Sequence, residues 1–203
     1  NAHVQATYCG PSRISGMSGL RPGTTGCYGF VPRYDEAPSL RDHVPLHGAF
    51  ARAGFQTVGG GKILHEGLGQ GWVRDLWEVQ LSNANNPTPK QRLHWPVKVW
   101  DWGAFPERDE QMGDFQLARE VADFVRQKQE RPFFAVAGFR RPHVPLHVPQ
   151  RWFDLYPLES LELPVVREDD LDDVPHPEVA TNVHAQPDHA DVLQGGHWRG
   201  PGQ

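Results

Sequence analysis

The chain has 203 residues, of which 38% are hydrophobic, and this composition fits one globular domain or part of a larger one. Its formal net charge of -5 provides no positive field for a phosphate backbone, so we expect no nucleic-acid partner. No segment approaches the ~18 consecutive apolar residues of a membrane-spanning helix, so we expect no membrane span.

Two cysteines are present, Cys9 and Cys27. Two thiols cannot form the framework of a small disulfide-stapled domain. A single Cys9–Cys27 bridge is one alternative. The sequence around Cys9 favours a different use of that thiol, and Cys27 lies in a glycine-rich loop where a lone thiol is usually inert.

The first third of the chain predicts a strand end, two helices and a strand. Residues 1–8 alternate weakly, as at the end of a strand. Pro11 and Ser12 predict the start of a short helix that ends near Gly19. A second helix is expected over 38–54, capped by Ser39, with Pro45 either kinking it or delaying its start. A buried strand is expected over 55–64.

The remainder predicts an insertion, a helix, a strand and a tail. Residues 66–113 are irregular and longer than a usual connection, which indicates an insertion. The strongest helix follows, over 113–129, with Asp114 at its cap. Its predicted core stripe is Phe115, Ala118, Val121, Ala122 and Val125. An apolar run over 131–139 is typical of a buried parallel strand, and 164–203 is expected to be poorly structured.

Cys9 and Arg13 are four residues apart near the predicted helix start. This spacing places both side chains on the same side of the first turn, beside free backbone N–H groups. A helix N-terminus with a guanidinium lowers the pKa of a thiol or holds a sulfate or phosphate. Taken alone, the spacing of Cys9 and Arg13 is also compatible with Cys9 being a small buried thiol without a catalytic or binding role.

The longer string CGPSRISGMSG resembles the signature of the type I sulfatases, Cys-x-Pro-Ser-Arg followed by three free positions, Leu or Met, Thr or Ser, and Gly. The matching positions are Cys9, Pro11, Ser12, Arg13, Met17, Ser18 and Gly19. In that family the cysteine is oxidised to formylglycine, whose hydrated aldehyde is the nucleophile. The resemblance therefore implies a sulfuric-ester hydrolase.

Two further segments resemble the iduronate-2-sulfatase-like and choline-sulfatase-like branches of that family. GGGKILHEG matches a Gly-Lys-x-x-His element, and FFAVAGFRRPHVPLHVPQRWFDLYP matches a Phe-Phe strand followed by Arg-Pro-His-x-Pro. The resemblance implies that Lys62 binds sulfate, that His65 acts on the formylglycine hydroxyl, and that His143 protonates the leaving oxygen. Arg141 is expected at the surface or behind the reacting groups.

The resemblance also implies a fold, cofactors and partners. The fold is an α/β, alkaline-phosphatase-like sandwich with a mixed central sheet flanked by helices. The metal is Ca2+, with Cys9 as formylglycine among its ligands. Expected partners are a sulfated small molecule or glycan and a formylglycine-generating or anaerobic maturating enzyme. A periplasmic or secreted location is expected.

The family's other metal ligands, an Asp-Asp pair before the cysteine and a later Asp with Asn or His, have no counterpart in this sequence. We therefore expect residues 1–203 to be an internal piece of the N-terminal catalytic domain and to be inactive alone. Two alternatives remain open: a phosphate or phosphonate monoester hydrolase of the same superfamily, and a truncated non-catalytic chain that binds sulfated ligands.

Overall fold

The computed structural model describes residues 3–94, 100–162 and 165. Two compact units are present, Asn1–Phe153 and Asp154–Gln203. Within the second, the described part contains the 3-10 helix η4 (Leu158–Ser160). The tail expected over 164–203 lies outside the described residues except for Val165, so that expectation is not tested.

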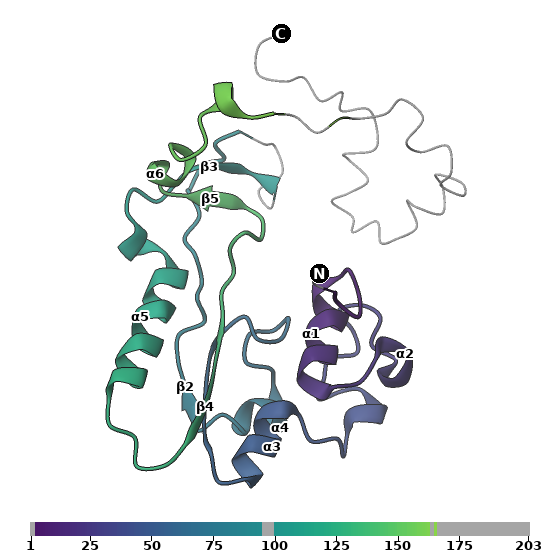
Figure 1. The fold of residues 1–203 in the computed structure, drawn as a ribbon. Helices are drawn as coiled ribbons and strands as arrows, with labels where there is room; N and C mark the ends of the chain where they lie inside the picture. Colours follow the sequence, from purple (N-terminus) through teal and green to yellow (C-terminus); the bar gives the residue numbers. More distant parts are fainter. Residues whose placement is uncertain (1–2, 95–99, 163–164, 166–203) are drawn as a thin grey trace, which may run out of the picture. The chain divides into compact units, whose positions relative to one another are not determined.

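A parallel sheet forms the centre of the first unit (Figure 1). Its order is β2 (Val79–Gln80), β1 (Gln56–Gly61) and β4 (Phe133–Gly138), and both pairings are parallel. The strands predicted over 55–64 and 131–139 are therefore confirmed, although β4 is half-buried and not buried as predicted. Strands that run in parallel need helical crossovers between them, and this order of elements confirms the α/β class.

Helices cover both faces of this sheet (Figure 1). On one face lies α5 (Gly113–Arg126), whose Leu117 side chain packs against the glycines of β1. On the other face lies α3 (Leu46–Arg52), where the ring of His47 stacks on Trp77 with centroids 4.1 Å apart. Trp77 in turn packs against Gly59, so the two helices are held on opposite sides of the same short strand.

The buried face of α5 differs from the predicted stripe. The helix itself is confirmed, but Leu117 is its fully buried apolar residue, whereas Ala118 is exposed and Val125 is 51% exposed. The glycines of β1 leave room directly in front of Leu117, and helical periodicity alone does not choose between neighbouring stripes. Asp114 lies in the first turn and is not the cap, which is Met112.

Two other predictions for the N-terminal third are corrected. Residues 3–8 form no strand. The helix expected over 38–54 is divided into the 3-10 helix η1 (Pro38–Leu40) and α3, and Pro45 is the N-cap residue of α3, so the proline delays the helix start. Ser39 caps neither element, because its hydroxyl donates to the carbonyl of Thr25 at 2.6 Å.

The segment 66–113, predicted as an insertion, contributes regular elements. Besides β2 it contains α4 (Gly71–Asp75), β3 (Trp102–Ala104) and η3 (Asp109–Gln111). A second, two-stranded sheet pairs β3 in parallel with β5 (Leu146–Val148). These strands are too short for alternation to predict them. The remaining helices of the described part are α1 (Cys9–Ser18), α2 (Pro22–Thr25) and α6 (Gln150–Phe153).

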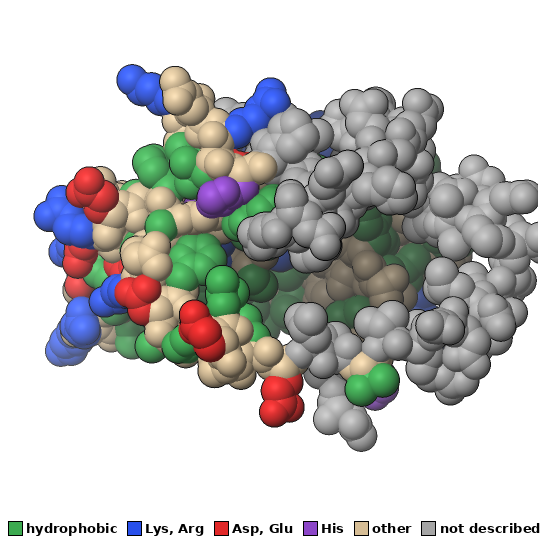
Figure 2. Space-filling view, turned by 90° about the horizontal axis from the view of Figure 1, so that it is seen from above, with side chains coloured by type: hydrophobic (Ala, Val, Ile, Leu, Met, Phe, Trp, Pro, Cys, Tyr) green, Lys and Arg blue, Asp and Glu red, His purple; other side chains and the backbone are tan. Residues whose placement is uncertain are grey.

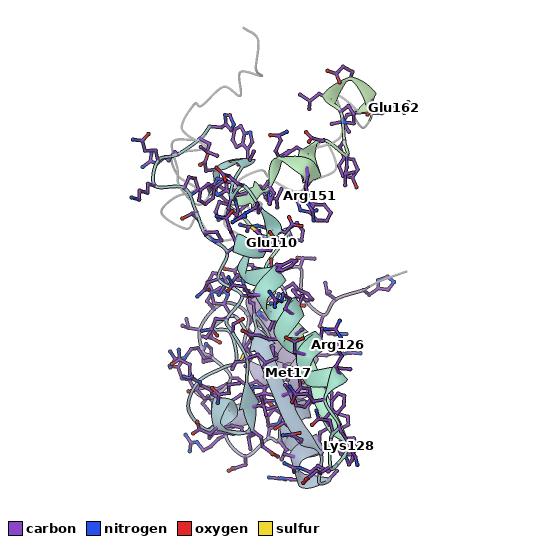
Figure 3. All side chains as sticks on the ribbon, turned by 90° about the vertical axis from the view of Figure 1, so that its left-hand side faces the viewer. Met17, Glu110, Arg126, Lys128, Arg151 and Glu162 are labelled. Atoms are coloured by element: carbon purple, nitrogen blue, oxygen red, sulfur yellow. The ribbon has the colours of Figure 1, made fainter. Side chains whose placement is uncertain are left out.

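The main hydrophobic core joins α1 to the residues that follow β1. Met17 of α1, labelled in Figure 3, is 7% exposed, and Trp77 is 2% exposed. On the face shown in Figure 2, the described surface intersperses basic and acidic side chains with hydrophobic ones. No helix among the described residues is long and apolar enough to cross a membrane. The buried core residues are Ile14, Met17, Cys27, Tyr34, Ala37, Leu40, Ile63, Leu64, Leu68, Val73 and Trp77.

The contact between Gly59 and Trp77 predicts a large effect of a single added methyl. A Cβ at Gly59 would lie 2.6 Å from the Trp77 ring, which is held from the other side by His47 and by a hydrogen bond of its Nε1 to Leu68 O. Gly59→Ala is expected to lower the free energy of unfolding by about 1–3 kcal/mol, measured by urea denaturation.

Gly16→Ala is the matched control, because a Cβ at this exposed position of α1 meets nothing within 4 Å. It is expected to raise the stability by up to about 1 kcal/mol, since alanine favours a helix over glycine. Equal effects of the two substitutions would contradict the close packing at Gly59.

Candidate active site

Cys9 is the first residue of α1, two positions earlier than the predicted start at Pro11 and Ser12. Tyr8 is the N-cap residue, with extended backbone and no side-chain capping bond. Pro11 lies in the first turn, where its missing N–H leaves no helical hydrogen bond unmade. The predicted helix end is confirmed, since Gly19 adopts the left-handed conformation at φ 72°. Cys9 is therefore a half-buried thiol at a helix N-terminus.

The loop before Val31 packs tightly on this helix start. A Cβ at Gly10 would lie 2.6 Å from the carbonyl oxygen of Gly29, so only glycine fits there without movement of the loop. The next residue, Phe30, stacks on the imidazole of His65 with ring centroids 4.0 Å apart, and contacts the ring of Tyr8 at 4.6 Å. Phe30 thus forms an apolar wall on one side of His65, between that imidazole and the ring of Tyr8.

Lys62 and His65 follow the C-terminal end of β1, where open α/β sheets place their ligands. The backbone N–H of Lys62 donates to Gly138 O at 2.6 Å, continuing the pairing of β1 with β4. Leu64 N–H then donates to Gly67 O at 2.7 Å, which closes a tight turn around His65. Lys62 is 4% exposed, an unusual burial for an ammonium group.

Arg13 joins α1 to this turn. Its Nη1 donates to the carbonyl oxygens of Lys62 and Ile63, the second at 3.4 Å. As a result the Cys9 thiol faces the imidazole of His65, with Sγ 3.7 Å from Nδ1. The structure therefore brings four of the predicted site residues together, and Arg13 is the one that holds the two segments in place.

Burial and neighbouring positive charges set the protonation of this cluster. Burial lowers the pKa of Lys62, an effect that nearby Cys9 opposes and Arg13 and Arg140 reinforce. Burial also lowers the pKa of His65, and the charge of Lys62 lowers it further. A histidine so placed is neutral at pH 7 and has an imidazole nitrogen free to accept a proton.

His143 lies on the loop after β4 and is the fifth predicted residue. It is exposed, and its Nδ1 lies 2.7 Å from Val144 O. It is within electrostatic range of the cluster, because its charge contributes to lowering the pKa of His65. Arg141 supports this loop from behind, donating to His147 O at 2.9 Å and to His143 O at 2.8 Å.

Two residues near the cluster were not among the predicted ones. Phe30 sits in an unremarkable Gly-Phe-Val stretch, and only its stacking on His65 reveals it. Arg140 precedes Arg141 in the Arg-Arg-Pro-His string, and its charge lowers the pKa of Arg13, Lys62 and His65. The sequence does not distinguish the two adjacent arginines. In the structure Arg141 donates to backbone carbonyls of its own loop, whereas the charge of Arg140 acts on the cluster.

The described residues do not form a calcium site. No group of three or more His, Cys, Asp or Glu side chains is placed to hold an ion anywhere in 3–94 or 100–162. Of the ligands implied by the resemblance, only Cys9 is present. Cys9 and Cys27 are both free, so the alternative of a bridge between them is not realised.

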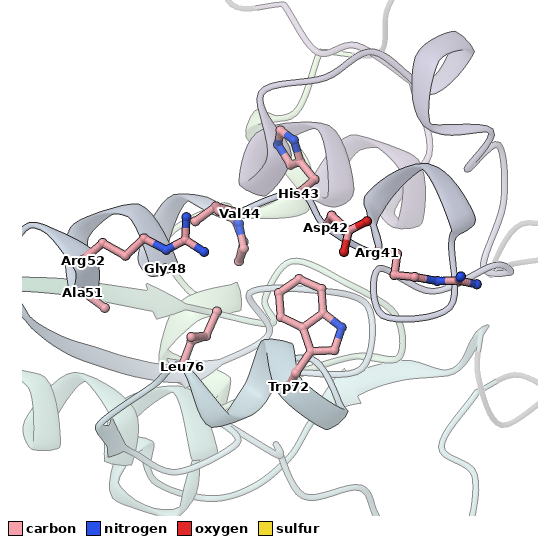
Figure 4. A pocket seen from close by; sticks show the side chains of 10 residues that line it. Arg41, Asp42, His43, Val44, Gly48, Ala51, Arg52, Trp72 and Leu76 are labelled. Atoms are coloured by element: carbon pink, nitrogen blue, oxygen red, sulfur yellow. The ribbon is translucent and has the colours of Figure 1, made fainter.

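A separate cavity of about 480 Å³ lies between α3, α4 and the segment before α3 (Figure 4). Arg52, Trp72 and His43 are among its walls, and the Nε2 of His43 is 2.8 Å from Ser18 O, at the opposite end of α1 from Cys9. None of the predicted site residues is among the described residues that line it, so the chemistry of the cluster does not extend there.

A helix N-terminus that presents a thiol to a histidine, beside a buried lysine at the end of a parallel strand, forms a candidate active site of an α/β protein. The Sulfatase family model matches residues 1–162, and this chain belongs to the sulfatase family. The family resemblance read from the Cys9 signature is thereby confirmed.

Named relatives are similar to most of this chain. It is 37% identical over 217 residues to a sulfatase of Formosa agariphila, covering 98% of this chain and 42% of that protein. It is 28% identical over 181 residues to iduronate 2-sulfatase of Homo sapiens, covering 80% of this chain and 32% of that protein. The chain thus spans less than half the length of these relatives.

Replacing Lys62 predicts a measurable change at His65. Lys62→Met removes the neighbouring charge while filling a similar volume, so the pKa of His65 is expected to rise toward 6.5, followed by NMR of the imidazole C–H signals. Lys128→Met, two residues beyond the end of α5 (Figure 3), is the control and should leave that pKa unchanged.

The same lowered pKa predicts how stability depends on pH. The unfolded chain binds a proton on His65 more readily than the folded one, so this contribution to stability is present above 6.5 and is lost as pH falls below it. Lys62→Met should weaken this loss. An unchanged His65 titration in that variant would contradict the proximity of the two side chains.

Proposed function

We propose that the protein containing this chain is a sulfuric-ester hydrolase that uses formylglycine made from Cys9 and acts on sulfated sugars. One observation carries the proposal: Cys9 Sγ lies 3.7 Å from His65 Nδ1, beside the buried Lys62, in a chain of the sulfatase family. The substrate class is supported by the relative named iduronate 2-sulfatase, although that name describes the relative alone.

Lys62 and Arg13 supply the positive charge that a sulfate group needs. The ammonium of Lys62 is largely removed from water, so an anion placed beside it replaces little solvent and is held strongly. The Nη1 of Arg13 donates to two backbone carbonyls, so Arg13 holds the Lys62 turn against α1. Its guanidinium also adds a positive charge beside Cys9.

The two histidines divide the proton transfers. Formylglycine, once formed at position 9, supplies a hydrated aldehyde as the nucleophile. His65 is kept neutral by its lowered pKa and accepts a proton through Nδ1 at the Cys9 position. His143 is assigned the role of donating a proton to the leaving alcohol, which its exposed position on the loop after β4 supports.

The remaining parts of the proposal concern groups outside the described residues. Sulfatases generally require a divalent metal, and we propose Ca2+ for the whole protein, with its carboxylate ligands supplied by other segments. Maturation of Cys9 requires a formylglycine-generating or anaerobic maturating enzyme as a partner. The proposed location is periplasmic or secreted.

Mass spectrometry of the Cys9 peptide tests the modification directly. In the full-length protein expressed with a maturating enzyme, this peptide is expected to be lighter by about 18 Da than the unmodified cysteine peptide. The Cys27 peptide of the same digest serves as the internal control and should keep its cysteine mass.

Sulfate release tests the activity. Cys9→Ala is expected to lower the rate of aryl sulfate hydrolysis by at least about 10³-fold, because it removes the nucleophile. Cys27→Ser should keep most of the activity. Faster hydrolysis of the corresponding phosphate ester would instead favour the phosphatase alternative, and an unmodified Cys9 in an active enzyme would contradict the formylglycine mechanism.

A further inference from the structure

A second small cavity, of about 110 Å³, lies beside His143. Arg140 and His143 line it from the loop after β4, and Asn85, Asn86 and Thr88 line it from the segment after β2. Polar side chains, a guanidinium among them, share its walls with Val144 and Pro145, whereas the wall that Phe30 forms beside His65 is apolar. The cavity therefore adjoins the candidate active site at the place proposed for the leaving group.

We infer that Arg140, with Asn85 and Thr88, forms a subsite that binds a second anionic group of the substrate, a carboxylate or a further sulfate. This inference rests on the proposed function and deepens it, since it assigns what lies next to the sulfate that is cleaved. The favoured substrates are then sulfated compounds with at least two negative charges.

Arg140 has the donors that such a subsite needs. Among the described residues its side chain forms no ion pair with a carboxylate, and its Nε makes one long hydrogen bond, 3.4 Å to Asn83 O. The neighbouring Arg141 is different, because its guanidinium is used by the carbonyls of His143 and His147. A guanidinium with free donors matches the geometry of a carboxylate or sulfate.

Asp114 positions Arg140 without neutralising it through a side-chain contact. Its Oδ1 accepts the backbone N–H of Arg140 at 2.7 Å, and its Oδ2 accepts the backbone N–H of Arg141 at 3.0 Å. The side-chain amide of Asn86 donates to the same Oδ2 at 2.8 Å, while Asp114 N–H donates back to Asn86 at 3.1 Å. This network joins the two segments that line the cavity.

Arg140 brings a third positive side chain to the surroundings of the cluster. Arg140 adds its charge to those of Arg13 and Lys62, and it contributes to lowering the pKa of both. An anion at the subsite would relieve this repulsion. A substrate with a second anionic group therefore gains binding energy that a singly charged one lacks.

Three aryl sulfates test the subsite in the matured full-length protein: phenyl sulfate, 3-carboxyphenyl sulfate and resorcinol disulfate. Arg140→Ala is expected to raise KM for one or both dianionic substrates by about tenfold or more beyond any change in KM for phenyl sulfate. Arg140→Lys should restore part of the loss. Arg126→Ala, which removes an exposed charge from the end of α5 (Figure 3), should change none of the three.

The two dianions separate the sources of the second charge, because a loss for one alone identifies the carboxylate or the sulfate as the preferred group. Equal losses for all three substrates would assign Arg140 to the reacting sulfate and overturn the subsite, as would no loss for any.

Binding of the same compounds to the Cys9→Ala variant, measured by calorimetry, keeps the two proposals apart. If the wild-type protein released no sulfate at all, the proposed function would fail. The subsite would still be supported if Arg140→Ala in this background weakened binding of the dianions more than binding of phenyl sulfate. It would be overturned if the substitution weakened both equally or neither.

Discussion

The candidate site depends on the docking of one guanidinium onto two backbone carbonyls. Arg13 leaves α1 one helical turn after Cys9 and donates to the carbonyls of Lys62 and Ile63. This bond fixes the thiol opposite His65, because α1 and β1 are separate elements that are joined, in the described part of the chain, mainly by apolar packing, which has no direction. A hydrogen bond from a charged donor has both strength and direction, which is what a site assembled from distant segments needs.

Glycines make that docking possible from the side of the sheet. The last three residues of β1 are Gly59, Gly60 and Gly61, and β4 ends at Gly138. Side chains at these positions would collide with Trp77, Leu117 or the backbone of the neighbouring strand. The absence of side chains lets the two strands and both helical layers approach closely, so that Lys62 emerges into a narrow space where it is buried beside the helix N-terminus.

The sequence predicted the parts of this arrangement that are local or carried by a family signature. It located α1, α5, the two long strands and the residues Cys9, Lys62 and His65, because apolar runs and motif spacing are properties of contiguous segments. It misplaced the buried face of α5 and the cap of that helix, since both are decided by what lies opposite. It could not select Phe30 or Arg140, whose importance comes from stacking and charge across long sequence separations.

The packing of Gly10 against the Gly29 carbonyl has a consequence for how the cysteine signature should be understood. The signature accepts any residue at its second position, which is Gly10 in this chain. The Gly29 carbonyl nevertheless leaves no room for a side chain there. A side chain at residue 10 would push on the loop that carries Phe30, and the displacement would reach the imidazole of His65 through the stacked rings. Variants at residue 10 would therefore differ in how closely the loop that carries Phe30 packs on α1. This difference is independent of whether Cys9 can be oxidised.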